Sequence, residues 1–476
     1  MPSATVPDDG SGKAVPPPRA AKAPVRWFRA TRALTQRWLV VIRRVLADPW
    51  APVTALILIL IVSFFARVID LSQPCSSPCK TPASHTLIFD ESYYVNAARI
   101  IDHIKPPPGD TYATAPFGMD PNAEHPQLAK VIVAGAIELF GDNPDGWRLP
   151  SVLFSLIALV ALYALVTGVG GSRWLAVGAV AVAALDNLML VHGRIFTLDI
   201  FGVAMMLISA NFYVRRMPLL AGVALGIGAN MKETALYLVA VFILLEAMRL
   251  ARSLFKSHDA KGWVQRNLRP AFTVLISTCV TGLLVLWIMD LLVPAYDTGT
   301  KITYAGSPFT HLFHIIHYAA LLHAVPNATG ISSTPWEWLL DQRTINYARV
   351  AVNSISNGMI VASRATIYFQ GEINPFIIFL AIPALFAALA QWWKENDAVS
   401  LIGAAWVLGT WLPSLYDAQI SGRIAYLYYM LAVMPGVYLI VVRLFSRKGM
   451  PTAATLGWSV GLVYSFLNLY PIRTLF

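Results

Sequence analysis

The sequence predicts an all-α polytopic membrane protein, and three observations carry that prediction. Hydrophobic residues make up 57% of the 476 residues, only 13% are charged, and the mean hydropathy is +0.58. A soluble domain carries roughly a quarter charged residues. Apolar runs long enough to cross a bilayer recur from end to end. The basic residues cluster in short loops between these runs, as expected for loops that face the cytoplasm.

The apolar runs predict about eleven transmembrane helices. Their expected bounds are 52–69, 148–169, 174–191, 197–213, 217–231, 234–250, 271–293, 374–392, 399–415, 424–442 and 452–470. Basic residues fall in alternate loops, whereas acidic residues gather in the long loop after the first span. This charge bias puts the N-terminus in the cytoplasm and the C-terminus outside, in the plasma membrane.

Three regions follow from this pattern. Residues 1–25 are rich in Pro, Ala and Lys and predict a disordered cytoplasmic tail. Residues 26–48 mix Arg with Trp, Leu and Val, which is typical of an amphipathic helix on the inner membrane surface. Residues 49–476 form the transmembrane domain, with outer loops at about 70–147 and 294–373. In the first of these loops, 91–104 and 126–140 are expected to lie along the membrane as amphipathic juxtamembrane helices.

Ionisable residues gather at the outer ends of the spans. Asp90 and Glu91 follow the first span, and ionisable groups at this depth are usually functional. The same layer contains Arg67, Arg148, His192, Arg194, Asp199, Lys232, Glu233 and Arg423. Each of these has an ordinary explanation by itself, such as an arginine that reaches lipid phosphates. As a set they exceed what membrane topology requires.

This set suits the transfer of a sugar from a lipid phosphate. Cations would bind the leaving phosphate, and a carboxylate would deprotonate the acceptor hydroxyl. We expect cationic neighbours to keep Asp90 ionised at a low pKa. No phosphate-binding loop or dinucleotide fingerprint is present, which argues against a sugar-nucleotide donor. The net charge of +10 does not indicate nucleic acid, because the basic residues lie in membrane loops.

Several motifs follow one another in an order typical of one family. They are Arg67, Phe89-Asp90-Glu91, His125-Pro126-Gln127-Leu128-Ala129-Lys130, Arg148, Arg194 to Asp199, Lys232, Ser333-Thr334-Pro335-Trp336-Glu337-Trp338, and Arg423 to Tyr429. The chain thereby resembles the GT-C membrane glycosyltransferases, most closely the polyprenyl-phosphate-mannose–protein mannosyltransferases of the bacterial type without a MIR insert. Gln127 and Ala129 depart from the family's His-Pro-Pro-Leu-Gly-Lys pattern.

The resemblance implies an inverting enzyme that moves mannose from polyprenyl-phosphate mannose to Ser or Thr hydroxyls of secreted or membrane proteins. Asp90 would be the general base, with Glu91 orienting the acceptor or a nearby arginine. The other implied roles are leaving-phosphate binding (Arg423, Lys232, Arg194), positioning of the diacid loop (Arg67, Arg148), shaping and support of the donor site (His125, Pro126, Lys130, Asp199), and acceptor or outer-loop contacts (Trp336, Trp338). The Sec translocon is a candidate partner.

Alternatives stay open at this point. A related GT-C enzyme could transfer aminoarabinose, arabinose or another lipid-linked sugar to a lipid or cell-wall glycan, and a transporter or flippase is a less favoured class. Cys75 and Cys79 could form a disulfide or, less readily, contribute to a metal site. His311, His314 and His317 share one helix face, where a polar surface is favoured over a metal site. No cofactor is certain, and assistance by Mg²⁺ or Mn²⁺ is left open.

Overall fold

The structure is a computed structural model that describes residues 47–476 except 77–78, 258–259, 324–329, 357–358 and 476. The predicted tail at 1–25 and nearly all of the predicted helix at 26–48 lie outside the described residues. The chain divides into two compact units, residues 1–54 and 55–476. The account below concerns the larger unit.

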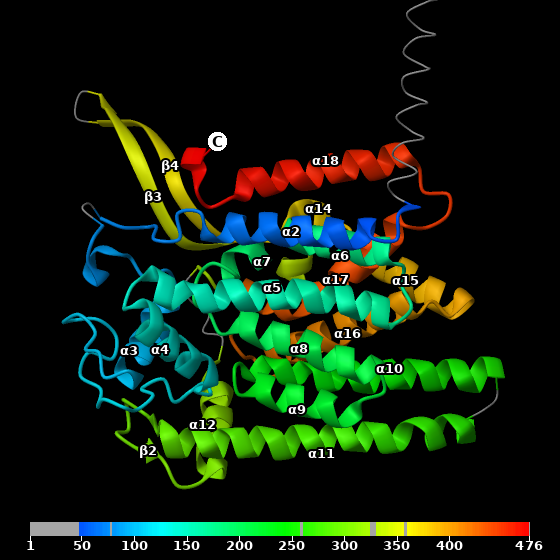
Figure 1. The fold of residues 1–476 in the computed structure, drawn as a ribbon, viewed down its shortest axis with the longest axis horizontal. Coiled ribbons are helices and arrows are strands. Elements are labelled where there is room, and N and C mark those ends of the chain that lie inside the picture. The colour runs from blue at the N-terminus through cyan, green and yellow to red at the C-terminus, as the bar shows by residue number, and fades with distance from the viewer. Residues whose placement is uncertain (1–46, 77–78, 258–259, 324–329, 357–358, 476) are drawn as a thin grey trace, which may run out of the picture. The chain divides into compact units, whose positions relative to one another are not determined.

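Helices of different lengths build the body of this unit, and the long ones lie side by side with their axes in a common direction (Figure 1). They are α2 (Ala51–Val68), α5 (Pro144–Gly168), α6 (Arg173–Ala184), α7 (Asn187–His192), α8 (Asp199–Val214), α9 (Pro218–Ala229), α10 (Tyr237–Arg252), α11 (Ala260–Leu292), α15 (Ala381–Glu395), α16 (Ala398–Gln419), α17 (Met430–Phe445) and α18 (Thr452–Leu469). The short helices η2 (Glu233–Leu236), α14 (Pro375–Ile378) and η4 (Leu427–Tyr429) precede α10, α15 and α17, and the π-helix η3 (Ser253–Ser257) follows α10.

Every predicted span overlaps a helix of the described chain, and the span at 174–191 is broken into α6 and α7. Among the described residues, seven helical segments are long and apolar enough to cross a membrane, while α6, α8 and α9 are apolar but shorter. The count of eleven crossings therefore stays a prediction. The mostly helical membrane fold that the sequence predicted is confirmed.

Local sequence signals account for where the helices begin. Asn143 accepts hydrogen bonds from the amides of Asp145 and Gly146 at the start of α5. Ser172 and Asp397 cap α6 and α16 in the same way. Such side chains satisfy amides that have no partner inside the helix, and each cap contributes about 1 kcal/mol.

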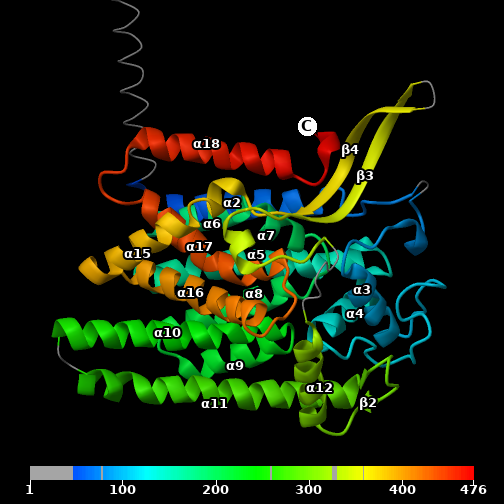
Figure 2. The same cartoon turned by 180° about the vertical axis from the view of Figure 1, so that it is seen from behind.

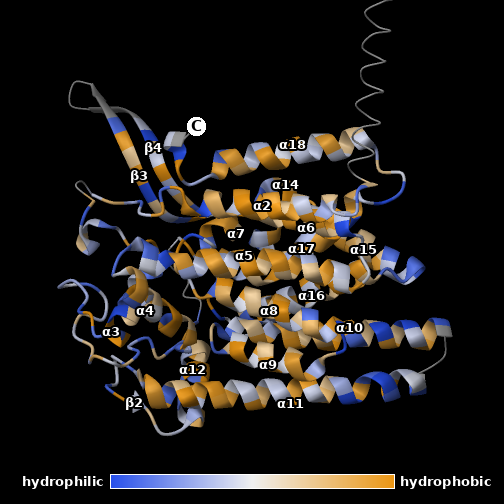
Figure 3. Ribbon diagram, in the orientation of Figure 1, coloured by the Kyte–Doolittle hydropathy of each residue, from blue (hydrophilic) through white to orange (hydrophobic). Residues whose placement is uncertain are grey.

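Hydrophobic residues, orange in Figure 3, recur along nearly all of the long helices. Helix α17 lies in the core, where Val433, Met434 and Val437 are fully buried. By contrast, α2 exposes Val62 (67%) and α11 exposes Ile276 (61%). Exposed apolar rows on several long helices are expected where lipid replaces water as the solvent.

One end of the helical body contains the large loops (Figures 1 and 2). The juxtamembrane helices predicted there are present as α3 (Glu91–Ile101) and α4 (Leu128–Phe140). The second large loop contains α12 (Pro308–Leu321), α13 (Pro335–Leu339), the short pair β1 (Ala295–Tyr296) and β2 (Thr303–Tyr304), and a long hairpin of β3 (Ile345–Ser356) and β4 (Met359–Gly371). The 3₁₀ turns η1 (Pro82–Ser84) and η5 (Arg473–Leu475) lie in the first loop and at the C-terminus.

The β3–β4 hairpin adds an element that the all-α prediction did not contain. Its strands pair antiparallel, with Ile345 opposite Gly371 and Arg349 opposite Tyr368. The side chain of Tyr347 in β3 packs against Phe89, with ring centroids 4.4 Å apart. The base of the hairpin therefore forms part of the surroundings of the diacid motif.

Candidate active site

Asp90 lies at the start of α3, at a point where the backbone is strained. The preceding residue, Phe89, has φ of 53°, a left-handed conformation that is uncommon for a residue with a side chain. Such a conformation costs on the order of 1 kcal/mol and tends to occur at functional sites. Asp90 is partly exposed, and its carboxylate makes no hydrogen bond to any described residue. It is therefore available to a substrate.

Glu91 is fully buried and accepts four hydrogen bonds. Nε and Nη2 of Arg148 donate to its two oxygens at 2.8 and 2.7 Å. The amides of Ile88 and Phe196 donate to the same carboxylate at 2.8 and 2.9 Å. Arg148 also donates to the carbonyl of Leu71 at 2.6 Å. Of the two roles considered for Glu91, this geometry favours the orientation of an arginine.

Four ionisable residues, Asp199, Lys232, Glu233 and His125, form a cluster, and two of them, Asp199 and Lys232, act directly on Asp90. Nζ of Lys232 lies 3.3 Å from Oε1 of Glu233 and 3.4 Å from Nδ1 of His125. His125 Nδ1 in turn lies 3.2 Å from the Glu233 carboxylate. Asp199, at the start of α8, acts electrostatically on both Asp90 and Lys232. The structure thus brings Asp90, Asp199, Lys232 and His125 together from separate parts of the chain.

Burial, and to a smaller extent the nearby Asp199 carboxylate, raise the pKa of Asp90 to about 7 against the opposing effect of Lys232. The expectation that cationic neighbours keep this pKa low was therefore wrong, because desolvation and a second acid outweigh one cation. A carboxyl group that titrates near neutral pH suits a general base, since it holds a proton more readily than a free aspartate does.

Lys232 and Arg423 supply positive charge to this region. Burial by itself lowers the pKa of Lys232, but Glu233 and Asp199 outweigh it, so the pKa lies above its usual value and the ammonium stays charged. Arg423 approaches Asp417 at 4.0 Å. Its buried Nε has no hydrogen-bond partner among the described residues. This N–H is free to bind an anion.

Aromatic side chains that the sequence reasoning missed line the same region. Phe89 contacts Tyr347 and Tyr428, with ring centroids 4.4 and 5.6 Å apart. The charge of Asp90 acts on Tyr94, Tyr347 and Tyr428, and burial raises the pKa of Tyr94 and Tyr347 well above the usual value. Tyr428 belongs to the motif from Arg423 to Tyr429, and Tyr94 follows Phe89-Asp90-Glu91 closely. By contrast, nothing in the sequence at 345–356 indicated that Tyr347 lies at the site.

The segment around His125 forms a rigid connection beneath this cluster. Nζ of Lys130 is buried, lies 2.5 Å from Asp120, and donates to the carbonyls of Asn122 and His125 at 2.7 and 2.9 Å. Pro126 is buried beside it. Lys130 therefore holds the loop that carries His125, and its part in shaping a donor site stays a prediction.

Two predicted phosphate-site or positioning residues lie elsewhere. Arg194 donates to the carbonyls of Ala66 and Ile69 at 2.7 and 2.6 Å, and to the hydroxyl of Tyr470 at 2.9 Å. Arg67 is fully buried and donates to the carbonyl of Ser63. Both arginines thus engage the end of α2, and the structure does not bring either of them to Asp90 by a hydrogen bond or ion pair within the described part of the chain.

The second outer loop packs directly on the segment after α16. The amide of Ser333 donates to the carbonyl of Ala425 at 2.9 Å, and Trp338 is buried with its Nε1 donating to Ser333. Trp336 is 45% exposed and packs edge-on against Trp411. Trp338 therefore holds the loop in place, whereas Trp336 stays partly exposed, and a contact of Trp336 with an acceptor stays a prediction.

The remaining candidates have separate environments. Cys75 and Cys79 form a disulfide. Together with His85 they make up the one group with metal-ligand spacing found among the described residues. His311 is buried and bonded to Asp290, which also accepts from Gln127, whereas His314 packs on Tyr304.

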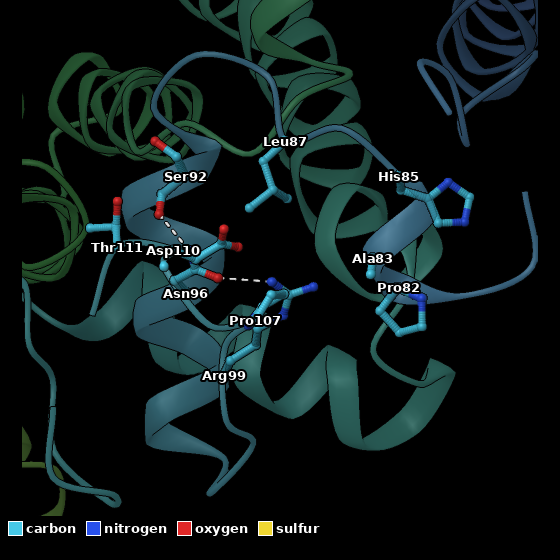
Figure 4. Close-up of a pocket in the computed structure, with 11 residues that line it drawn as sticks. Pro82, Ala83, His85, Leu87, Ser92, Asn96, Arg99, Pro107, Asp110 and Thr111 are labelled. Carbon is cyan, nitrogen blue, oxygen red and sulfur yellow. Dashed lines mark hydrogen bonds between the residues drawn. The ribbon is translucent and has the colours of Figure 1, made fainter. Parts of the chain in front are cut away.

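A hollow of about 360 Å³ lies on the far side of α3 (Figure 4). Ser92, Asn96 and Arg99 project into it from α3, opposite Pro82 and His85. Residues 92, 96 and 99 share one face of the helix, and Asp90 and Tyr94 lie on the other. This hollow is therefore separate from the Asp90 cluster.

Comparison with known proteins is consistent with this geometry. Residues 124–264 match the family described as dolichyl-phosphate-mannose-protein mannosyltransferase. A polyprenol-phosphate-mannose–protein mannosyltransferase of Corynebacterium glutamicum is 25% identical over 85% of this chain and 86% of its own length. One from Mycolicibacterium smegmatis is 25% identical over 90% of each chain.

Solved structures show the same fold. The protein O-mannosyltransferase complex of S. cerevisiae bound to its sugar donor matches with a TM-score of 0.64 and 11% identity over 89% of this chain and 90% of that one. The chain has the fold of the GT-C glycosyltransferases and is similar to protein mannosyltransferases over most of its length. ArnT from Cupriavidus metallidurans, a further neighbour of this glycosyltransferase, matches with a TM-score of 0.52 and 15% identity over 87% of this chain and 63% of ArnT.

Proposed function

We propose that this glycosyltransferase transfers mannose from polyprenyl-phosphate mannose to Ser or Thr hydroxyls of proteins, with inversion at the anomeric carbon. The observation that carries the proposal is the Asp90 carboxylate, which has no hydrogen-bond partner among the described residues, a pKa of about 7, and charged Lys232 beside it. The relatives named for this reaction align with most of the chain, which supports the same chemistry here.

In this mechanism the acceptor oxygen attacks the anomeric carbon as its proton passes to Asp90. The bond between that carbon and the phosphate oxygen breaks, and its electron pair leaves with the lipid phosphate. Lys232 and the free N–H of Arg423 stabilise the negative charge that develops there. Glu91 and Arg148 do not contact the substrate in this mechanism. Their ion pair fixes the start of α3 and thereby positions Asp90.

We place the reaction at the outer face of the membrane, with the N-terminus in the cytoplasm. Two features support this orientation. The opposite end from α3 and α4 carries Arg215 and Arg216 after α8, Arg252 at the end of α10 and Lys256 in η3, as the positive-inside bias requires on the cytoplasmic side. A prenyl-linked donor and a translocated protein would both be available at the outer face. Association with the Sec translocon stays a prediction, which co-purification from crosslinked membranes would test.

A protein acceptor is favoured over a lipid or glycan acceptor. The yeast mannosyltransferase is covered over 90% of its length, whereas ArnT is covered over 63%. Transport is disfavoured because the Asp90 cluster lies at one end of the helices, while a transporter keeps its site near the midplane.

The test is transfer of radiolabelled mannose from polyprenyl-phosphate mannose to a Ser/Thr-Pro-Ala-rich peptide by the purified full-length chain. Asp90→Asn should lower the rate at least 1,000-fold with donor binding retained. The control is Asp145→Asn, which alters an exposed acid at the same end and should leave the rate within twofold. Equal rates for the wild type and Asp90→Asn would remove Asp90 as the base. No peptide transfer by a folded wild type that transfers to a lipid acceptor would overturn the protein acceptor.

Assistance by Mg²⁺ or Mn²⁺ also stays a prediction. Asp90 and Asp199 are suitable oxygen ligands in type, but Lys232 already acts on both carboxylates with positive charge from the chain itself. Addition of EDTA to the transfer assay, followed by either metal, decides the matter. A rate that EDTA abolishes and Mn²⁺ restores would establish metal assistance, and an unchanged rate would exclude it.

A further inference from the structure

A basic hollow lies where the β3–β4 hairpin meets the C-terminal segment, apart from the Asp90 cluster. Its volume is about 610 Å³, and its lining includes Arg349 of β3, Arg364 and Tyr368 of β4, and Arg473 of η5. The amide of Tyr368 donates to the carbonyl of Pro471 at 2.8 Å, which fixes the C-terminal segment against the hairpin. Arginines from three elements therefore face one space.

These arginines are held together without a carboxylate at ion-pair distance. Arg473 and Arg349 lie over the ring of Tyr368, at 5.0 and 5.9 Å from its centroid. Within the described part of the chain, no carboxylate forms an ion pair with Arg349, Arg364 or Arg473, although Glu372 interacts electrostatically with Arg473 and Nη2 of Arg473 donates to Oε1 of Gln370 at 2.9 Å. Nε of Arg473 is buried and lacks a hydrogen-bond partner among the described residues. Like charges gathered in this way repel one another unless an anion binds between them.

An exposed apolar row on α18 leads to the same hollow. Leu456, Val460, Val463, Tyr464 and Leu467 recur at helical spacing, and the first two are 61% and 69% exposed. Leu467, at the end of this row, also lines the basic hollow, as does Asn468. The row forms an exposed apolar surface along α18 on which an acyl chain could pack, and the arginines lie at its end.

We propose that this hollow, the Arg349–Arg364–Arg473 site, binds the phosphate of an anionic membrane lipid while the lipid's chains lie along α18. Guanidinium groups bind phosphate in a bidentate manner. A phospholipid has an anionic phosphate next to apolar acyl chains, so it complements a surface on which cationic groups lie next to an apolar area. The site lies at the end of the molecule that the proposed topology puts outside, where clustered cations are not needed for topology. The ligand is a phospholipid of the outer leaflet.

The site is tested by native mass spectrometry of the full-length chain in detergent, titrated with dioleoyl-phosphatidylglycerol or dioleoyl-phosphatidylcholine. We expect tighter binding of the phosphatidylglycerol. Arg349→Gln with Arg364→Gln should weaken it about 25-fold, since each surface arginine contributes roughly fivefold. The matched control is Arg343→Gln, which removes another exposed arginine of the same loop, one paired with Glu337, and should change the affinity less than twofold.

Three results would overturn the proposal: equal binding of the two lipids, an unchanged affinity in the double variant, or displacement of the lipid by sodium phosphate at equal concentration. A second titration of the same protein uses undecaprenyl phosphate. Tighter binding of undecaprenyl phosphate than of the phosphatidylglycerol, weakened by Arg364→Gln, would overturn the assignment of a phospholipid and identify the carrier lipid as the ligand. If the double variant does not fold, as judged by thermal unfolding, Arg364→Gln by itself should still weaken lipid binding about fivefold.

Discussion

Replacement of Glu91 by glutamine tests whether the buried acid of the diacid motif acts through structure. Glu91 is fully buried, and all four of its hydrogen bonds come from N–H donors. A carboxamide offers one acceptor oxygen, so its amino group must face either Arg148 and Ile88 or Arg148 and Phe196. Two of the four bonds are then lost, and the buried guanidinium keeps no carboxylate.

Breaking a buried ion pair from one side costs about 3–5 kcal/mol. We expect Glu91→Gln to lower the free energy of unfolding by that amount. It should also lower kcat/KM for mannose transfer about 100-fold, because a displacement of about 1 Å at Asp90 has that effect. The measurements are thermal unfolding in detergent and steady-state transfer. Glu138→Gln, at an exposed acid of α4, is the control and should stay within about 0.5 kcal/mol of wild type.

The double variant Glu91→Gln/Arg148→Gln separates structure from substrate contact. Two neutral side chains can bond to each other, so the double variant should be more stable than the sum of the two single changes by about 1–3 kcal/mol. Additive losses would refute the pairing argument. A Glu91→Gln enzyme of normal stability with only a raised KM for the peptide would instead assign Glu91 to acceptor binding.

Three further outcomes are expected. Because a protonated carboxyl cannot take up a proton, kcat/KM should fall as the pH falls through about 7, the pKa of Asp90, and a pH-independent rate from pH 5 to 9 would exclude this base. Lys232→Met and Arg423→Met should each lower kcat/KM about 100-fold by removing charge at the leaving phosphate, with equal rates to wild type as the contrary result. In the unfolded chain, maleimide should label one thiol, Cys279, before reduction and three after it; three labels before reduction would exclude the disulfide of Cys75 with Cys79.

The transmembrane body could be predicted from the sequence because each span is a long apolar run, and such runs have one stable solution in lipid. The break between α6 and α7 was missed although Asp186 lies inside the run. Its buried carboxylate accepts from the amide of Asn374 and from Tyr438, residues far along the chain. A local pattern contains no information about such partners.

The sequence predicted where the site residues lie along the helices, but it did not predict which of their side chains contact one another. Lys232 and Arg194 both lie where one apolar segment gives way to the next, but of the two only Lys232 acts on Asp90. Arg194 faces the end of α2 instead. The start and end of each apolar run predict how far along the membrane normal a residue lies. Which side chains contact one another depends on how the helices pack. For the same reason Tyr347 was missed, since its strand pairs within a loop that has no membrane periodicity.

Because of the charges around Asp90, we expect binding of the donor to raise the pKa of this proposed base. Asp199 raises the pKa of Asp90 and Lys232 lowers it. A bound lipid phosphate would draw on the charge of Lys232 and add its own negative charge, so both effects strengthen Asp90 as a base when the donor is in place. Asp199→Asn removes one of these contributions. It should move the pH midpoint of kcat/KM below that of wild type and lower the plateau rate, because a weaker base accepts the proton less readily. An unmoved midpoint would show that Asp199 does not act on Asp90 during turnover.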